Sequence, residues 1–227
     1  MKVSRKLWAI IIPSILFFNV VKAQNLESGA DASAAIASNE DSASDDAAVS
    51  LKALLKGLKT FKAQFKQTVN DAQGELLQES GGELSLKQPN LMLWQVIEPD
   101  ENQMIADGQT LWYVDPFVEQ VTAVQQAQSV ANNPVVLLTD PDNTSWQDFS
   151  IHLLNDEYVI EALNPESQIA RLILQFDKQG VLSSLRFIDR QQQISALQFS
   201  NIEQNQTITD DVFVFALPEG FEMDDQR

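Results

Sequence analysis

The chain has 227 residues, 44% of them hydrophobic, and a formal net charge of −17 at pH 7. This hydrophobic content supports a folded core of ordinary size and excludes a chain that is disordered throughout. The negative charge argues against nucleic acid or an anionic lipid surface as a partner, and the absence of cysteine excludes disulfides.

Residues 1–23 have the pattern of a secretory signal peptide. Basic residues precede an apolar run over residues 7–21, and Ala23 ends a small-residue cleavage pattern. A transmembrane anchor is the alternative, but the run is short for a bilayer span and contains a proline. Cleavage after Ala23 changes the charge to −21, because it removes Lys2, Arg5, Lys6 and Lys22. No cysteine follows the cleavage site to carry a lipid, so we expect an exported, soluble protein.

Residues 24–49 are rich in alanine, serine and acidic residues, with no basic or aromatic residue. Such a segment buries too little apolar surface to offset the entropy of ordering it. We therefore predict a disordered acidic linker over 24–49, followed by a single domain over 50–227.

An amphipathic helix is predicted from Ser50, a good N-cap residue. Its apolar positions follow helical spacing: Leu51, Leu54, Leu55, Leu58, Phe61 and Phe65. Five lysines occupy the other side: Lys52, Lys56, Lys59, Lys62 and Lys66. The helix either packs on a sheet with its lysines in solvent, or serves as a lid or as a docking face for an acidic partner.

After this helix the apolar period changes to two. Short alternating segments are separated by turn sequences such as Asp107-Gly108 and Asn164-Pro165, and they run from "SGGELSLKQP" to "DVFVFAL". Only residues 133–140 offer a second helical candidate, so parallel crossovers are not expected. The prediction is a mainly β fold, an antiparallel meander curled toward a barrel.

Two segments are apolar on both faces. In "NLMLWQVIEP", Met92, Trp94 and Val96 lie opposite Leu91 and Leu93, and "DGQTLWYVDPFVEQVTA" behaves similarly. A strand of this kind is either covered on both sides or lines a cavity for an apolar guest. The pattern alone favours the first interpretation.

The same two segments, with the closing "FVFALPEGFEMDDQR", resemble the outer-membrane lipoprotein carrier family (LolA) of Gram-negative bacteria. The resemblance covers residues 50–227. It implies an incomplete antiparallel β-barrel, capped by short α-helices, that encloses a hydrophobic cavity for the acyl chains of lipoproteins.

The resemblance also implies which side chains contact lipid. These are Leu54, Leu55 and Leu58 in the first helix, Leu137 and Leu138 in the second helical segment, and Met92, Trp94, Val96, Met104, Trp112, Tyr113, Phe117 and Phe176 on the strands. Met92 and Met104 would give the pocket adaptable walls.

A carrier of this family acts as a periplasmic chaperone. As the resemblance implies, it takes acylated outer-membrane lipoproteins from an inner-membrane ABC transporter and hands them to the outer-membrane receptor LolB. We expect such a carrier to be a monomer with no cofactor and no nucleic-acid partner. Because the chain lacks a cysteine for lipidation, it matches the soluble carrier rather than LolB.

Gln88 departs from the family pattern. Related carriers commonly have an arginine before Pro-Asn-Leu, where it holds the lid shut, whereas this chain reads "LKQPNL". Glutamine can donate and accept hydrogen bonds but lacks the charge and forked geometry of arginine. We treat Gln88 as the candidate lid latch. Lys87 is a substitute, although it should face the opposite side of the strand.

No catalytic or metal-binding pattern is evident. His152 is the only histidine, and no nucleophile motif or metal-ligand spacing is present. We therefore expect neither an enzyme nor a metal protein. The alternative to a lipoprotein carrier is a general periplasmic lipid-binding or interaction protein of the same fold.

Overall fold

A computed structural model describes residues 37–130 and 133–227. The predicted signal peptide and residues 24–36 of the acidic segment lie outside the described residues. Within the described ranges, no helix is both long and apolar enough to cross a membrane.

The first helix, α1, spans Ala37–Gly57 and begins well before Ser50. Disorder was predicted up to residue 49, and that prediction is wrong from residue 37 onward. Alanine is the best helix former, and this half of the helix is alanine-rich with acidic residues, which favour a helix N-terminus. Ala47 and Leu51 are almost fully buried, so tertiary packing also holds the helix.

The predicted helix also ends too late. Strand β1 spans Thr60–Asn70, so Phe61 and Phe65 lie on a strand, where Ala63 between them is buried too. Lys62 and Lys66 point to the other face and form ion pairs with acidic residues of the neighbouring strand. Gly57, a poor helix former, is the last residue of α1 and ends the helix before β1 begins.

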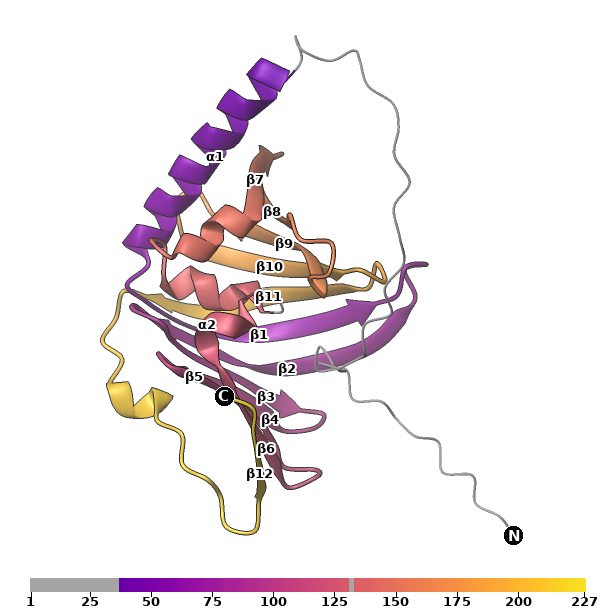
Figure 1. Cartoon of the computed structure of the whole chain (residues 1–227), viewed down its shortest axis with the longest axis vertical. Coiled ribbons are helices and arrows are strands. Elements are labelled where there is room, and N and C mark those ends of the chain that lie inside the picture. The colour runs from indigo at the N-terminus through magenta and orange to yellow at the C-terminus, as the bar shows by residue number, and fades with distance from the viewer. Residues whose placement is uncertain (1–36, 131–132) are drawn as a thin grey trace. The chain divides into compact units, whose positions relative to one another are not determined.

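The other strands follow the predicted meander closely. Twelve strands form a single sheet in the order β12-β6-β5-β4-β3-β2-β1-β11-β10-β9-β8-β7. Eleven further strands complete the sheet: β2 Leu76–Lys87, β3 Leu91–Glu98, β4 Asn102–Asp107, β5 Thr110–Asp115, β6 Gln120–Gln125, β7 Phe149–Leu154, β8 Glu157–Ala162, β9 Ile169–Phe176, β10 Leu182–Asp189, β11 Ile194–Gln204 and β12 Glu222–Asp225. All pairs are antiparallel except β12 with β6. The expected open, curled, mainly β fold is confirmed (Figure 1).

Short helical segments make up the remaining regular secondary structure of the described residues. They are α2 Gln126–Ser129, η1 Pro134–Thr139, η2 Thr144–Asp148 and η3 Asp210–Phe213. The second predicted helical segment, 133–140, corresponds to the 3-10 helix η1. The predicted strand "DVFVFAL" is instead η3 followed by extended chain outside the sheet.

The sheet curls strongly enough for distant strands to touch. Trp94 on β3 stacks on Phe187 of β10 with ring centroids 5.9 Å apart, although three strands separate β3 from β10 in the sheet. Phe65 of β1 packs against the same indole at 5.6 Å. These aromatic contacts lie on the concave face, where the main hydrophobic cluster is also found.

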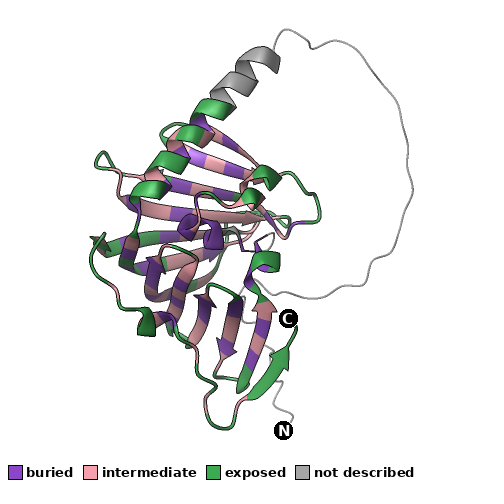
Figure 2. Cartoon of the chain, turned by 60° about the vertical axis from the view of Figure 1, so that its left-hand side comes forward, coloured by how far each residue is buried: buried purple, intermediate pink, exposed green. Residues whose placement is uncertain are grey.

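The C-terminal segment accounts for the second apolar face of β3–β6. Residues 205–221 run along the convex side of these strands, where Phe213 is buried and η3 contacts β3 and β4. Lys87 faces this side, as alternation requires, and its Nζ binds the Ile208 carbonyl and the Asp210 carboxylate, both at 2.6 Å. Figure 2 shows the resulting alternation of burial along the strands, with β12 exposed throughout.

Candidate functional site

The concave face of β3–β6 is built from paired rows of side chains. One row runs across the sheet through Met92, Ala106, Leu111 and Val124, and the next through Trp94, Met104, Tyr113 and Thr122. Directly paired residues of antiparallel strands share a face, so each row forms a continuous strip. Except for Thr122, these side chains belong to the main hydrophobic cluster or pack against it. Val96 extends the cluster toward the end of β3.

Two covering elements pack against the hydrophobic cluster of the concave face: α1, which contacts β7, and η1, which contacts β2, β3 and β9. From the first helix and the residue that follows its last turn, Leu51, Leu55 and Leu58 are almost fully buried in the cluster, and Leu54 packs at its edge. From η1, Val135, Val136 and Leu138 enter the same cluster. Leu137 is equally buried but lies outside the cluster. Phe176 of β9 packs at the margin, edge-on to Tyr158 at 5.9 Å.

Polar contacts from several parts of the chain hold α1 over the sheet. The Gln88 side-chain Nε2 donates to the Leu55 carbonyl at 2.6 Å, near the C-terminal end of the helix. The Tyr158 hydroxyl donates to Ser50 Oγ at 3.0 Å. Ion pairs from Lys52 and Lys56 to one Asp142 oxygen, at 2.6 and 3.2 Å, tie the helix to the loop after η1.

The position of Gln88 fits a latch. Its amide donates to a carbonyl in the last turn of α1, that of Leu55, which also accepts the Leu58 backbone N–H at 2.9 Å. Its Oε1 accepts from Lys59 Nζ at 3.3 Å, and its backbone N–H donates to the Lys59 carbonyl at 2.9 Å. The substitute candidate, Lys87, binds the C-terminal segment on the convex side and does not contact α1.

One polar pair interrupts the apolar concave face. Burial raises the pKa of the Tyr113 phenol to about 12, and a hydrogen bond from the Asn133 amide partly offsets that rise. Asn133 is only 6% exposed, and its Nδ2 also donates to the Met104 sulfur at 2.7 Å. Sequence patterns did not single out Asn133, because an asparagine before proline is ordinarily a turn signal.

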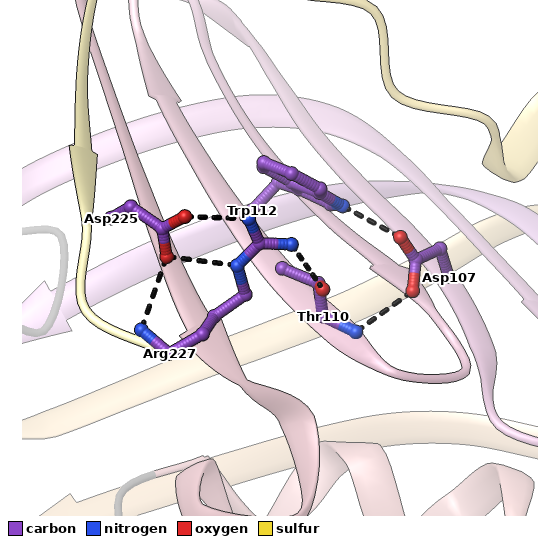
Figure 3. Close-up of polar contacts among 5 residues, drawn as sticks. All are labelled: Asp107, Thr110, Trp112, Asp225 and Arg227. Atoms are coloured by element: carbon purple, nitrogen blue, oxygen red, sulfur yellow. Dashed lines mark hydrogen bonds and ion pairs between the residues drawn. The ribbon is translucent and has the colours of Figure 1, made fainter.

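Trp112 was expected to contact lipid, but the structure places it on the convex face. It neighbours Tyr113 in β5, and successive strand residues face opposite sides. Its ring stacks on Phe215 at 4.3 Å, and its Nε1 donates to Asp107 at 2.8 Å (Figure 3). Arg227 lies over the same ring, with its guanidinium carbon 5.1 Å from the centroid. Trp112 therefore anchors the C-terminal segment.

Hydrogen bonding controls the charge of Asp107 in this anchor. Burial alone raises the pKa of this carboxyl, but hydrogen bonds from Thr110, Trp112 and Gln109, with the positive charge of Arg227, hold the pKa below its usual value. The carboxylate therefore stays ionised and accepts the indole N–H, as a charge-assisted hydrogen bond requires.

Phe117 does not join the concave face either. It lies in the turn between β5 and β6 and is 76% exposed, with Val118 beside it at 55%. The strand ends at Asp115, whose carboxylate accepts the Phe117 backbone N–H and so starts the turn.

An open pocket elsewhere in the described region is lined by Gln109, Thr110, Asp225 and Arg227 among others, and such a polar lining is unsuited to acyl chains.

Comparison with known proteins agrees with this arrangement. The family described as "Outer membrane lipoprotein carrier protein LolA" matches residues 56–216, which include the concave rows and Gln88. The chain belongs to the LolA family.

Curated relatives extend the same similarity over most of the LolA-family chain. An outer-membrane lipoprotein carrier protein of Aeromonas salmonicida is 37% identical over 182 residues, which are 80% of this chain and 90% of the relative. One from Actinobacillus succinogenes is 38% identical over 182 residues, which are 80% of this chain and 87% of the relative. Among solved structures, a LolA superfamily protein from Nitrosomonas europaea is 11% identical. The match covers 74% of this chain and 98% of that protein, with a TM-score of 0.43.

Proposed function

We propose that this LolA-family protein is a periplasmic chaperone that shields the acyl chains of outer-membrane lipoproteins on its concave face. The observation that carries the proposal is how that face is covered. The apolar concave face of the sheet is covered by η1, which contacts β2, β3 and β9, and by α1, which contacts β7, rather than by a second sheet, and α1 is held by a few polar contacts. Such a cover can be displaced while the sheet stays intact.

The energies of closing and loading are compatible. Burying a leucine side chain contributes about 2 kcal/mol, so lifting the three buried leucines off the sheet costs on the order of 6 kcal/mol. One acyl chain of ordinary length gains on the order of 10 kcal/mol when its methylenes leave water, at about 0.8 kcal/mol each. Cargo can therefore replace α1 on the concave face, and α1 can return when the cargo leaves.

The proposal extends to export and partners. Residues 1–23 are removed as a signal peptide, and the mature protein works as a monomer between the inner and outer membranes. It receives lipoproteins from an inner-membrane ABC transporter and passes them to LolB, without catalysis of its own. The formal charge of −21 that remains after removal of residues 1–23 supports this, because it keeps the empty carrier off anionic membrane surfaces.

The experiment is release of newly made triacylated lipoprotein from spheroplasts into the soluble fraction, with and without the purified protein. We expect release in a one-to-one complex. Val124→Glu places a charge on the concave face and should abolish release, whereas Val118→Glu, in the exposed β5–β6 turn, should not. Binding of fatty acids without any lipoprotein release would instead indicate a general lipid-binding protein.

A further inference from the structure

Tyr113 and Asn133 place hydrogen-bonding groups where the fold needs only apolar surface. The Tyr113 ring lies in a row with Trp94 and Met104, and a phenylalanine would fill the same space without a hydroxyl. The chain contains 12 phenylalanines and 2 tyrosines. The other tyrosine, Tyr158, uses its hydroxyl to hold α1, which suggests a specific polar role for the hydroxyl of the half-buried Tyr113 as well.

Asn133 is held rigidly in front of this row. Its backbone N–H donates to the Ser129 carbonyl at 2.8 Å, and its own carbonyl accepts from Val136 at 3.3 Å, which fixes the residue between α2 and η1. Its side chain is thereby directed at the Tyr113 hydroxyl and the Met104 sulfur. The amide thus belongs to the covering elements and the phenol to the sheet.

The acceptor that now occupies the Asn133 amide is a weak one. A thioether sulfur accepts hydrogen bonds poorly, whereas a carbonyl oxygen accepts them well. Methionine is also flexible and can move aside when a better acceptor arrives. In the closed protein the Met104 sulfur therefore accepts a hydrogen bond from the Asn133 amide that an oxygen atom would accept more favourably.

We propose that Tyr113 and Asn133 form a binding site for the carbonyl oxygen of an acyl ester or amide, with the Met104 sulfur as its substitute in the closed state. The inference rests on the proposed function, because lipoprotein acyl chains carry such carbonyls where they join the head of the molecule. The subsite fixes how deep each chain enters, since only the first carbon of a chain carries the oxygen.

The chemistry of the pair selects a neutral carbonyl over a carboxylate. Both donors are uncharged; burial raises the pKa of Tyr113, the Asn133 amide offsets part of that rise, and no charged neighbour is among the causes. A carboxylate brought to this place would lose its hydration without gaining a cation. A fatty acid is therefore a poorer ligand than an ester with the same chains.

The test compares two synthetic diacylated lipopeptides with the same chain lengths and no N-acyl chain, one with ester-linked glycerol chains and one with ether-linked chains, so that only the first has acyl carbonyls. Their affinities for the purified protein are measured by displacement of an environment-sensitive apolar dye. The unmodified protein should bind the ester form about five-fold more tightly, as one added hydrogen bond predicts. Tyr113→Phe and Asn133→Leu should each reduce the ratio to near one, with unchanged affinity for the ether form.

Tyr158→Phe serves as the matched control, because it removes the other phenol and should preserve the ester preference. Equal binding of the two lipopeptides by the unmodified protein, or a preference that survives Tyr113→Phe, would overturn the inference while leaving the carrier function intact. Failure of the unmodified protein to bind either lipopeptide would instead contradict the proposed function and this subsite with it. Since Tyr113→Phe removes a single oxygen, it keeps the test decisive if Asn133→Leu does not fold.

Discussion

The amide of Gln88 donates to the carbonyl oxygen of Leu55 at 2.6 Å, across 33 positions of sequence. This bond joins the turn between β2 and β3 to the last turn of α1. The Leu55 carbonyl also accepts the Leu58 backbone N–H at 2.9 Å, so the Gln88 amide adds a second donor to a helix-terminal carbonyl. An uncharged glutamine thus contacts α1 at the position where the family resemblance implies an arginine.

Gln88→Leu should loosen α1 without unfolding the sheet. A neutral hydrogen bond contributes about 1 kcal/mol, so amide hydrogen exchange in α1 should accelerate about five-fold. The control is Gln198→Leu, because Gln198 Nε2 also donates to a backbone carbonyl, that of Ser183, but away from α1. Exchange in α1 that is equal in the two variants would contradict the latch, and so would unchanged cargo release in Gln88→Arg.

Asp142 should make lid closure sensitive to acid. Hydrogen bonds from Lys52 and Lys56 lower the pKa of this carboxyl below its usual value of 3.8. A lowered pKa stabilises the closed state above the usual pKa, and that contribution is lost as the pH falls through the lowered value. Dye binding to the concave face should therefore rise below pH 3.8 in the unmodified protein.

In Asp142→Asn this acid-dependent rise should be smaller, and dye binding at neutral pH should already be slightly higher. The effect is modest because both ion pairs are largely exposed and screened by salt. Identical pH profiles for the two proteins would show that these ion pairs do not hold the lid.

Phe117→Ser should change neither stability nor lipid binding. The side chain is 76% exposed in a turn, and substitutions at such sites usually stay within about 0.5 kcal/mol. Met92→Ser, at a fully buried position of the concave face, should lower the free energy of unfolding by about 3 kcal/mol. Urea denaturation and dye binding measure both effects, and a loss of dye binding in Phe117→Ser would return this residue to the lipid site.

Most of the sheet could be predicted because apolar alternation is local information. The error at Phe61 and Phe65 has a physical cause, since residues four apart share a face in both a helix and a strand. Those two positions alone could not distinguish the periods. Ala63 decides the matter in the structure, because it is buried between them on the same face of β1.

The candidate site was predictable only in part, because both faces of β3–β6 are apolar. Alternation places Trp112 and Tyr113 on opposite sides, but it cannot say which side is concave. That depends on residues 205–221, which cover the convex face from about a hundred positions away in sequence. Asn133 was missed for a similar reason, because its proposed role depends on its contacts with Tyr113 and Met104, which are distant in sequence, and not on a local pattern.

Trp112→Ala should release the C-terminal segment while the concave face remains intact. It removes the stack on Phe215, the contact with Arg227 and the hydrogen bond to Asp107, and we expect a loss of about 2 kcal/mol for a half-buried aromatic. Limited proteolysis within residues 205–221 should accelerate, with dye binding unchanged. Trp112→Phe keeps a ring but loses the hydrogen bond, so its rate of proteolysis should lie between those of the unmodified protein and Trp112→Ala. Slow proteolysis in Trp112→Ala would show that Lys87 and η3 suffice to hold the segment.

Tyr113→Phe should make the protein more resistant to alkali. The pKa of this phenol is raised from 10.0 to about 12, so between these values the unfolded chain ionises while the folded protein stays neutral. Tyr113 therefore does not lower the free energy of unfolding below pH 10, but it lowers this free energy progressively as the pH rises toward 12. The loss is on the order of 2 kcal/mol, from about 1.4 kcal/mol per unit of pKa.

Urea denaturation at pH 9 and pH 11.5 measures this difference. Tyr113→Phe should lose less stability between the two pH values than the unmodified protein, whereas Tyr158→Phe should lose as much, because it retains Tyr113. Lysines titrate over the same range, but they are common to all three proteins and cancel in the comparison. Equal alkaline losses in the unmodified protein and Tyr113→Phe would mean that the phenol reaches solvent. It would then ionise in the folded state, and the concave face would be open to water at this point.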